Sequence, residues 1–288
     1  MQTTNARSVE GGLSLGARRL IAYIVLVLIT IMCLFWFVLL FVNATRSNGE
    51  LAKGFSLVPS THLIENWLNV YHGTNPVIAG MINSFIIAAF SSALSVYFST
   101  MTAYAIHAYD FKLKKFMFTF ILMVMMIPTQ VTALGFINLM RKMKLMDSFI
   151  PLIIPAIAAP AVFYYMKQYM ESALPLAIIE AARIDGANEF YTFNSIVLPM
   201  MKPAIAVEVI FSFVASWNNY FTPALILKSE TKKTLPILIA LLRSADFMKF
   251  DMGQVYVTIA FSIFPVIIVY LLLSKNIVGG IALGAVKG

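Results

Sequence analysis

Long apolar runs separated by short polar segments dominate the chain. Each run is long enough to cross a bilayer as a helix, because about 20 residues span the roughly 30 Å of hydrocarbon. The pattern therefore predicts an all-α integral membrane protein with six transmembrane helices. The six runs are Leu20–Val42, Ile78–Tyr109, Phe116–Met140, Phe149–Met166, Ala204–Leu227 and Val255–Ser274.

Proline and small hydroxyl residues lie within these runs. Pro128 interrupts the third run and Pro265 the sixth, so we expect a break or a kink at each. Hydroxyl side chains also recur on one face of the second run at helical spacing. They would serve either close helix packing or a polar pathway, and they are Ser84, Ser91, Ser95 and Thr102.

The composition excludes an ordinary soluble domain. Of the 288 residues, 60% are hydrophobic and only 12% are charged, whereas soluble domains are about 25% charged. The mean hydropathy is +0.84, so membrane lipid is the expected solvent for much of the chain. The net charge of +8 does not indicate a nucleic acid partner, since the basic residues are scattered over short loops. Cys33 is the only cysteine, which excludes a disulfide framework.

The first run is predicted to be a retained helix rather than a secretory signal peptide. It follows Arg18 and Arg19, as a signal peptide would. Its apolar part, however, exceeds the usual length of about 7–15 residues, and no small-residue cleavage site follows it. Lys and Arg are almost equally divided between the two sides of a six-span chain. The positive-inside rule therefore leaves the orientation undecided.

No catalytic or metal-binding pattern is evident. The sequence lacks a G-x-x-x-x-G-K-[ST] loop, an H-E-x-x-H motif and a Cys/His cluster of metal-ligand spacing. The three histidines lie far apart, and Glu208 is the only acid deep within a span. We therefore expect no enzymatic activity, no metal site and no cofactor in this chain.

The polar stretch IIEAARIDGANEFYTFNSIVLP concentrates charge between two apolar runs. With the preceding Pro175 in its first turn, it predicts a helix that ends in a left-handed turn at Gly186. A second short helix is expected from about Asn188 to Val197, stopping before Pro199. Two alanines beside a glutamate give the first helix a close-approach surface suited to a groove in another protein. The alternative is an ordinary connector between two membrane helices.

This stretch resembles the EAA motif, EAA---G---------I-LP, of permease subunits of bacterial binding-protein-dependent ABC importers. Every fixed position is present at the family spacing: Glu180, Ala181, Ala182, Gly186, Ile196, Leu198 and Pro199. The stretches MMIPTQVTALGFINLMRKMKLMDSFIPLIIP, SWNNYFTPALIL and GGIALGAVKG resemble the carbohydrate branch, in particular the second permease subunit of the maltose, multiple-sugar and raffinose type. The resemblance covers about Trp67 to Gly288.

The resemblance implies half of a pore for a sugar, of oligosaccharide size. It implies a heterodimer with a second permease subunit, two ATPase subunits that carry ATP and Mg²⁺, and an extracytoplasmic solute-binding protein. It also implies a multi-pass protein of the bacterial cell membrane with both termini cytoplasmic. The motif residues, with Arg183 and Asp185, are expected to couple to the ATPase, Glu180 through a charge pair. The C-terminal residues expected to contact the ATPase are Gly284, Ala285, Val286, Lys287 and Gly288.

Pore-lining candidates lie in the fifth run. Glu208, Ser212, Ser216 and Asn219 fall within an arc of about 80° on a helix, and ionisable residues within spans usually face a wet cavity. We expect these residues and the adjacent Asn218 to line the pore. The alternative for Glu208 is a hydrogen bond to a neighbouring helix. Asn219 stands where the family often has an acid, and Glu208 where a small neutral residue is common, so both could alter the cavity.

The resemblance divides the chain into a cytoplasmic tail (1–19), a first helix with the start of an external loop (20–66) and a permease domain (67–288). The permease domain includes the coupling loop (171–199) and a C-terminal cytoplasmic tail (275–288). Two other functions compete with sugar import. One is import of glycerol phosphate or another small solute by the same type of permease. The other is ion-coupled secondary transport, against which the complete EAA motif argues.

Overall fold

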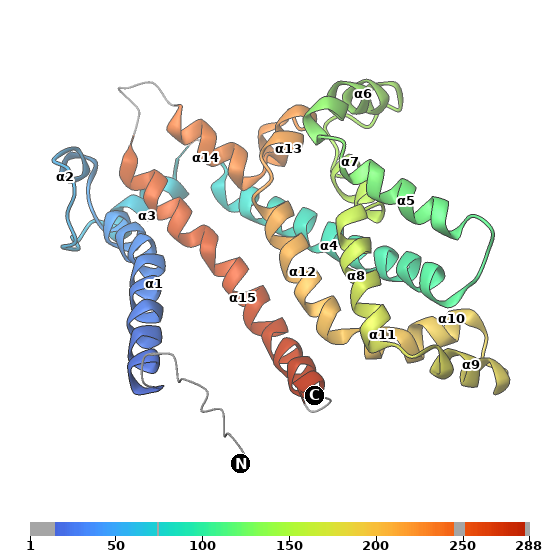
Figure 1. Ribbon diagram of the computed structural model, residues 1–288. Coiled ribbons are helices and arrows are strands. Elements are labelled where there is room, and N and C mark those ends of the chain that lie inside the picture. Colours follow the sequence, from blue (N-terminus) through green and yellow to red (C-terminus); the bar gives the residue numbers. More distant parts are fainter. Residues whose placement is uncertain (1–14, 74, 245–250, 286–288) are drawn as a thin grey trace, which may run out of the picture.

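The computed structural model describes residues 15–73, 75–244 and 251–285, and these residues form helices joined by turns and loops (Figure 1). α4 (Val77–Ala108) is the longest uninterrupted helix of the centre. α8 (Pro160–Ala173) and α12 (Lys202–Trp217) both pack against it. α15 (Met252–Ala285) packs against α12, and α1 (Leu15–Ala44) lies on the outer side of α15.

The described chain contains four helical segments that are long and apolar enough to cross a membrane. They are α1, α4, Ile150–Ala173 and the Met252–Ile277 part of α15. The number rises to six if each of two sharply bent helix pairs forms one broken span, and this count agrees with the six predicted runs.

One bent pair confirms the predicted break at Pro128. α5 (Lys114–Met125) and α6 (Thr129–Lys142) meet at 96°, and Pro128 is the residue that precedes α6. The other pair joins Glu189–Met200 to α12 at 82°. Prolines also divide the fourth run, because α7 (Ile150–Ile153) and the 3₁₀ turn η1 (Ile154–Ile157) precede α8, which begins at Pro160. α15 continues through Pro265.

The prediction of one helix over Ala204–Leu227 is wrong. α12 ends at Trp217, and a separate short helix, α13, covers Phe221–Ile226. The side-chain oxygen of Asn219 accepts a hydrogen bond from the Thr222 backbone N–H at 3.3 Å. This N–H therefore bonds to a side chain in place of a carbonyl of a continuing helix. The chain therefore changes direction between α12 and α13.

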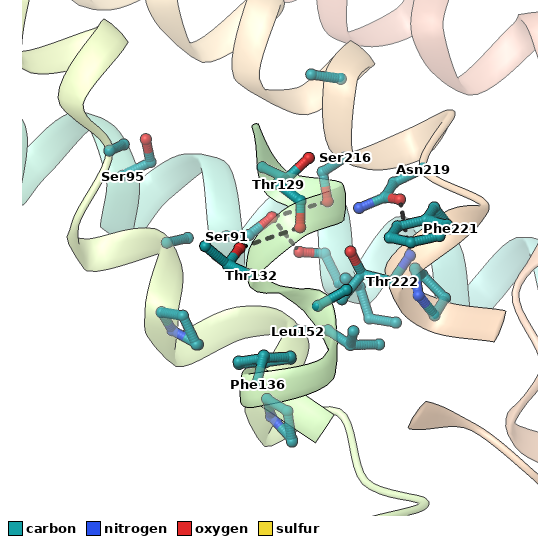
Figure 2. A pocket seen from close by; sticks show the side chains of 18 of the residues that line it. Ser91, Ser95, Thr129, Thr132, Phe136, Leu152, Ser216, Asn219, Phe221 and Thr222 are labelled. Atoms are coloured by element: carbon teal, nitrogen blue, oxygen red, sulfur yellow. Dashed lines mark hydrogen bonds between the residues drawn. The ribbon is translucent and has the colours of Figure 1, made fainter. Parts of the chain in front are cut away.

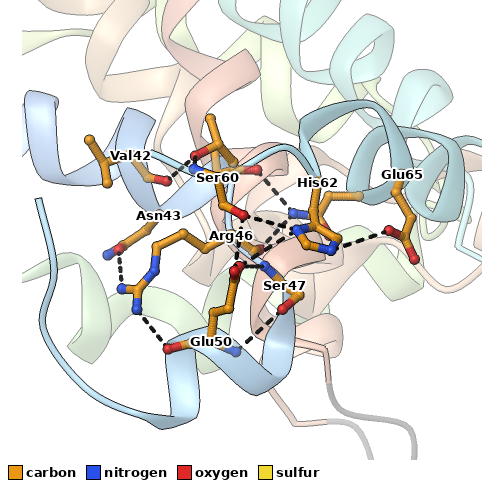
Figure 3. Close-up of polar contacts among 11 residues, drawn as sticks. Val42, Asn43, Arg46, Ser47, Glu50, Ser60, His62 and Glu65 are labelled. Atoms are coloured by element: carbon orange, nitrogen blue, oxygen red, sulfur yellow. Dashed lines mark hydrogen bonds and ion pairs between the residues drawn. The ribbon is translucent and has the colours of Figure 1, made fainter. Parts of the chain in front are cut away.

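The segment between α1 and α4 folds around the buried Arg46. Its guanidinium donates to the carbonyl oxygen of Glu50 at 2.7 Å (Figure 3). It also donates to the carbonyl oxygen of Gly54 at 3.1 Å. The Glu50 carboxylate accepts from the Ser60 hydroxyl at 3.0 Å and lies 3.6 Å from the His62 ring. This segment contains α2 (Asn48–Ala52) and α3 (Leu63–Tyr71).

The ends of the molecule differ in what they contain. α2, α6, α13 and α14 (Leu235–Arg243) lie at one end, whereas the start of α1, the described end of α15 and the polar stretch after α8 lie at the other (Figure 1). α14 docks closely on α4, because a Cβ at Gly80 would come within 2.3 Å of the Leu238 side chain. The hydroxyl of Ser84 also accepts a hydrogen bond from the Leu235 N–H at 2.8 Å.

Candidate functional site

A cavity of about 850 Å³ lies where α4, α6, α7, α12 and α13 meet. Hydroxyl and amide side chains from four of these helices line it, and apolar walls come from Phe136, Leu152 and Phe221 (Figure 2). None of the described residues that line this cavity carries a charge. The polar lining residues are Ser91, Ser95, Thr129, Thr132, Ser212, Ser216, Asn219 and Thr222.

A hydrogen bond between α4 and α12 holds part of this polar lining. The Ser91 hydroxyl of α4 lies 2.6 Å from the Ile87 carbonyl oxygen and 2.9 Å from the Ser216 hydroxyl of α12. Hydroxyl oxygens have two lone pairs and rotate to suit a partner, so they can still bind a solute. A neutral, hydrogen-bonding surface with apolar walls suits a polyhydroxylated solute without charge.

The hydroxyl face predicted on the second run serves both packing and the cavity. Ser84 is used in packing, through its bond to α14, whereas Ser91 and Ser95 line the cavity. Thr102 differs from the other three, because it is exposed and donates to the Phe98 carbonyl of its own helix at 2.8 Å.

The polar stretch after α8 forms the predicted helix–turn–helix. α9 (Leu176–Ile184) follows Pro175, and Gly186 has φ +80°. The Ala187 N–H bonds to the Ala182 carbonyl and the Gly186 N–H to the Arg183 carbonyl, which is the hydrogen-bond pattern of a Schellman C-cap. Asn188 caps α10 (Glu189–Tyr191) by accepting from the Tyr191 N–H at 2.8 Å. We call residues 175–200 the coupling element.

The second half of the coupling element continues further than predicted. A π-helical segment, η2 (Thr192–Val197), leads into α11 (Leu198–Met200), so the prediction that the helix stops before Pro199 is wrong. Pro199 lies in the first turn of α11, where a missing N–H is tolerated. The residues before Pro199 are in π-helical register, so they do not form the α-helical hydrogen bonds that a proline would interrupt.

An ion pair joins the two halves of the coupling element. The Arg183 Nε donates to the Glu189 carboxylate at 2.8 Å, and the Tyr104 hydroxyl of α4 donates to the other carboxylate oxygen at 2.6 Å. The Arg183 guanidinium also lies 4.9 Å from the centre of the Tyr109 ring, within the range of cation–π attraction. Arg183 therefore has its partners within this chain, and Glu189 links α9, α10 and α4.

One further contact attaches the coupling element to α4, and another holds the residue just before it. The Tyr97 hydroxyl donates to the Asn194 side chain at 3.1 Å, and the His107 ring lies 3.0 Å from the Leu174 carbonyl oxygen. The apolar inner face of the coupling element is buried and includes Ile179, Ala182, Phe193 and Val197. These contacts make the coupling element and the end of α4 one packed unit.

The outer face of the coupling element is exposed and apolar. Ile184 is 86% exposed, Phe190 73% and Tyr191 55%. Glu180, Ala181 and Asp185 are exposed on the same element, whereas Ala182 packs inside the chain. Ile196 and Leu198 are half-buried and Pro199 is exposed.

The fifth-run candidates separate into three groups. Ser212, Ser216 and Asn219 line the large cavity. Asn218 is exposed and donates to the Val214 carbonyl of its own helix at 3.0 Å. Glu208 is buried in a different, smaller cavity. Among the described residues, no group of three or more His, Cys, Asp or Glu side chains could hold a metal ion.

The predicted C-terminal contact falls partly outside the described residues. Gly284 and Ala285 form the last residues of α15, so the predicted tail from 275 onward is helical as far as Ala285. Val286, Lys287 and Gly288 lie outside the described residues, as do residues 1–14 of the predicted N-terminal tail.

Asp147 clamps two turns at the end of the molecule opposite the coupling element. It lies between α6 and α7 with φ +56°. Its carboxylate accepts hydrogen bonds from the backbone N–H groups of Lys228 and Ser229 at 2.9 and 3.0 Å, and the Lys232 ammonium lies 3.3 Å away. The Ser229 hydroxyl and these N–H groups hold the pKa of Asp147 well below its usual range.

The Asp147 clamp should survive mild acid. A group with a lowered pKa contributes stability that is present above its unfolded pKa, about 3.9 for Asp, and is lost only as pH falls through the lower folded value. We expect protection of the Lys228 and Ser229 amides from hydrogen exchange, corrected for intrinsic rates, to be equal at pH 7 and pH 5. Asp147→Gly tolerates the positive φ but removes both carboxylate oxygens, and with them the acceptor for the Lys228 and Ser229 amides, so it should expose both amides at either pH. Asp110→Asn, at an exposed loop position, is the control. Protection that decreases between pH 7 and pH 5 would contradict this assignment.

Comparison with known proteins identifies the family. The profile of the family described as "Binding-protein-dependent transport system inner membrane component" matches residues 95–282, which include the coupling element and most of the cavity. The chain belongs to this family. A similar relative of the same family, the arabinooligosaccharides transport system permease protein AraQ of Bacillus subtilis, is 31% identical over 91% of this chain and 93% of its own.

Other similar proteins are named for different transport systems. The lactose transport system permease protein LacG of Rhizobium radiobacter is 26% identical over 93% of this chain and 96% of its own. The sn-glycerol-3-phosphate transport system permease protein UgpE of Yersinia pestis is 28% identical over 90% of this chain and 94% of its own. A crystal structure of a bacterial ABC transporter involved in the import of the acidic polysaccharide alginate contains a chain that matches with TM-score 0.78. That chain is 22% identical, and the match covers 92% of this chain and 99% of that one, which supports the fold.

Sequence reasoning missed the residues that hold the site in place. Glu189 is one of the charges of the polar stretch, but no motif singles it out, and none singles out Tyr104, Tyr109 or Asp147. The available signal was local: Arg183 and Glu189 flank the glycine turn, at a separation that brings their side chains together if the turn reverses the chain.

Proposed function

We propose that this chain is one half of the membrane pore of an ATP-driven uptake system for a neutral sugar of oligosaccharide size. The observation that carries the proposal is the large cavity, whose described lining is uncharged and rich in hydroxyl groups. A phosphate ester in a membrane cavity would require a compensating cation, because an unpaired buried charge is very costly. The lining therefore favours the arabinooligosaccharide and lactose relatives as guides over the glycerol-phosphate relative.

The proposed partners follow from the family. A second permease subunit completes the pore, two ATPase subunits bind ATP and Mg²⁺, and a solute-binding protein delivers the sugar on the outer side. The exposed apolar face of the coupling element, with Ile184, Phe190 and Tyr191, is suited to a groove on an ATPase subunit. Glu180 supplies a charge at the edge of that face.

The proposed mechanism is a rigid-body movement. Closure of the ATPase dimer on ATP displaces the coupling element, and the Arg183–Glu189–Tyr104 contacts transmit this displacement to α4. α4 also contributes Ser91 and Ser95 to the cavity, so the displacement reaches the sugar path through one continuous helix. The cavity then opens alternately to the two sides of the membrane.

Reconstitution of the complete complex tests this function. Proteoliposomes that contain both permeases and the ATPase pair should take up arabinotriose or lactose when ATP and the loaded binding protein are supplied. They should not take up sn-glycerol 3-phosphate at a comparable rate. Preferential uptake of glycerol phosphate would overturn the sugar assignment, and uptake driven by an ion gradient without ATP would overturn the ATP-driven mechanism.

The proposed orientation has both termini and the coupling element in the cytoplasm. In a Cys33→Ser background, Lys53→Cys and Lys228→Cys should react with an impermeant maleimide in intact cells. Lys112→Cys, in the exposed turn between α4 and α5, should react only after permeabilisation. All three positions are exposed, so a difference in labelling reports the side of the membrane. Labelling of Lys112→Cys in intact cells would reverse the orientation.

A further inference from the structure

A second cavity of about 350 Å³ surrounds the carboxyl group of Glu208. It lies where α8, α12 and α15 approach one another (Figure 1). Tyr165 and Tyr169 of α8 form one wall, the first two turns of α12 form another, and Ile277 of α15 closes a third side. Apart from the two phenol groups and Glu208, this lining is apolar.

Glu208 has no partner in the described part of the chain. Glu208 is only 7% exposed. Its side chain makes no hydrogen bond and no ion pair with any described residue. A buried carboxyl group without a partner is costly, and ionisable groups within membrane spans usually mark a functional path. The cavity thus presents a hydrogen-bonding group that the chain itself leaves unused.

The small cavity and the large one both border α8 and α12, at successive turns of each helix. Glu208 lies four residues before Ser212 on α12, which places the two side chains about 40° apart on the helix and about 6 Å apart along its axis. On α8, Val162 lines the large cavity, and Tyr165, one turn further, lines the small one. The two cavities therefore follow each other along the α8–α12 groove toward the coupling-element end of the molecule.

We infer that the Glu208 cavity is an inner subsite that holds a sugar after it leaves the large cavity. The carboxylate can accept hydrogen bonds from several sugar hydroxyl groups, and Tyr165 offers a ring face with a polar edge. The inference rests on the proposed function, because it assumes that the transported solute is a sugar. It goes beyond that function by assigning a second binding position and the residues that form it.

The subsite predicts a change in transport rate and in sugar preference. In proteoliposomes of the complete complex, Glu208→Gln should lower the maximal rate of ATP-dependent uptake about tenfold, because a neutral amide makes weaker hydrogen bonds than a carboxylate. The KM should stay close to the wild-type value, since the binding protein captures the sugar first. The ratio of arabinotriose to lactose uptake should also shift.

A second variant keeps the inference testable if Glu208→Gln fails to assemble. Tyr165 is 60% exposed, so Tyr165→Leu should not disturb folding, yet it should also shift the uptake ratio. Phe211→Leu is the matched control, because Phe211 is on α12, is 66% exposed and lines neither cavity. Purified yield should equal wild type in Tyr165→Leu and in the control, and basal ATPase activity should equal wild type in the Phe211→Leu control.

The outcomes separate this inference from the proposed function. A wild-type complex that takes up neither sugar overturns both. A wild-type complex that takes up a sugar, with unchanged rate and ratio in Glu208→Gln and Tyr165→Leu, overturns the subsite alone. Uptake that requires sodium or a proton gradient in the wild type, and loses that requirement in Glu208→Gln with an unchanged sugar ratio, would make Glu208 a cation site and overturn the subsite.

Discussion

Replacing Gly186 with valine should reduce sugar uptake by at least about tenfold while the complex still assembles. Gly186 has φ +80°, and a Cβ there would meet no atom within 4 Å. The expected defect is therefore conformational rather than steric, with a strain of about 1–2 kcal/mol for a β-branched residue in the left-handed region. Relief of that strain turns α10 away from α9 and separates Arg183 from Glu189. Uptake in proteoliposomes, measured beside ATPase activity with loaded binding protein, reports the loss of coupling.

A substitution series distinguishes the turn from other effects at Gly186. Asparagine tolerates positive φ, so Gly186→Asn should retain most uptake. Gly49→Val is the matched control, because Gly49 also has open space around its Cβ but no positive φ. Equal uptake in Gly186→Val, Gly186→Asn and wild type would remove the coupling role from this turn.

Replacing Glu189 with alanine should uncouple ATP hydrolysis from transport. The substitution removes the acceptor for both Arg183 and Tyr104, which are the polar links between α9, α10 and α4. The ion pair alone is worth little, because the Arg183 and Glu189 side chains are 36% and 43% exposed. With the Tyr104 bond included, we expect a loss of about 1–2 kcal/mol of coupling, or roughly a tenfold fall in sugar uptake for each ATP hydrolysed.

Two variants test the Glu189 prediction. Glu189→Gln keeps an acceptor for Tyr104 and should have an intermediate effect. Glu171→Ala removes an exposed ion pair with Lys167 within α8, which joins no two elements, so its coupling ratio should be unchanged. A normal coupling ratio in Glu189→Ala would mean that apolar packing alone transmits the movement.

The spans could be predicted from the sequence because lipid imposes a simple requirement of length and hydropathy. Pro128 and Gly186 were predictable for a related reason, since each restricts or permits a backbone conformation on its own. The break after Trp217 was missed because the apolar character continues through α13, and only the bond from the Thr222 N–H to Asn219 explains it.

The candidate site was predictable only in part. Helical spacing placed Glu208 on the same face of one helix as Ser212 and Ser216. It could not show which neighbouring helices enclose each residue, and Tyr165 and Ile277 place Glu208 in its own cavity. The Asp147 clamp depends on residues more than 80 positions apart in sequence, and no local pattern indicates such a contact.

α4 has a consequence for how information passes across the membrane. Its 32 residues, about 48 Å of helix, carry Asn83 and Ser84 at one end, bonded to the loop and helix around Lys233 and Leu235. The other end carries Tyr104, bonded to the coupling element. Equilibrium coupling between two sites is reciprocal. In the proposed complex, ATP binding that alters the affinity of the loops around Lys233 for the solute-binding protein requires the converse effect. Docking of that protein must alter the affinity for ATP by the same factor, so α4 would couple the two sites in both directions.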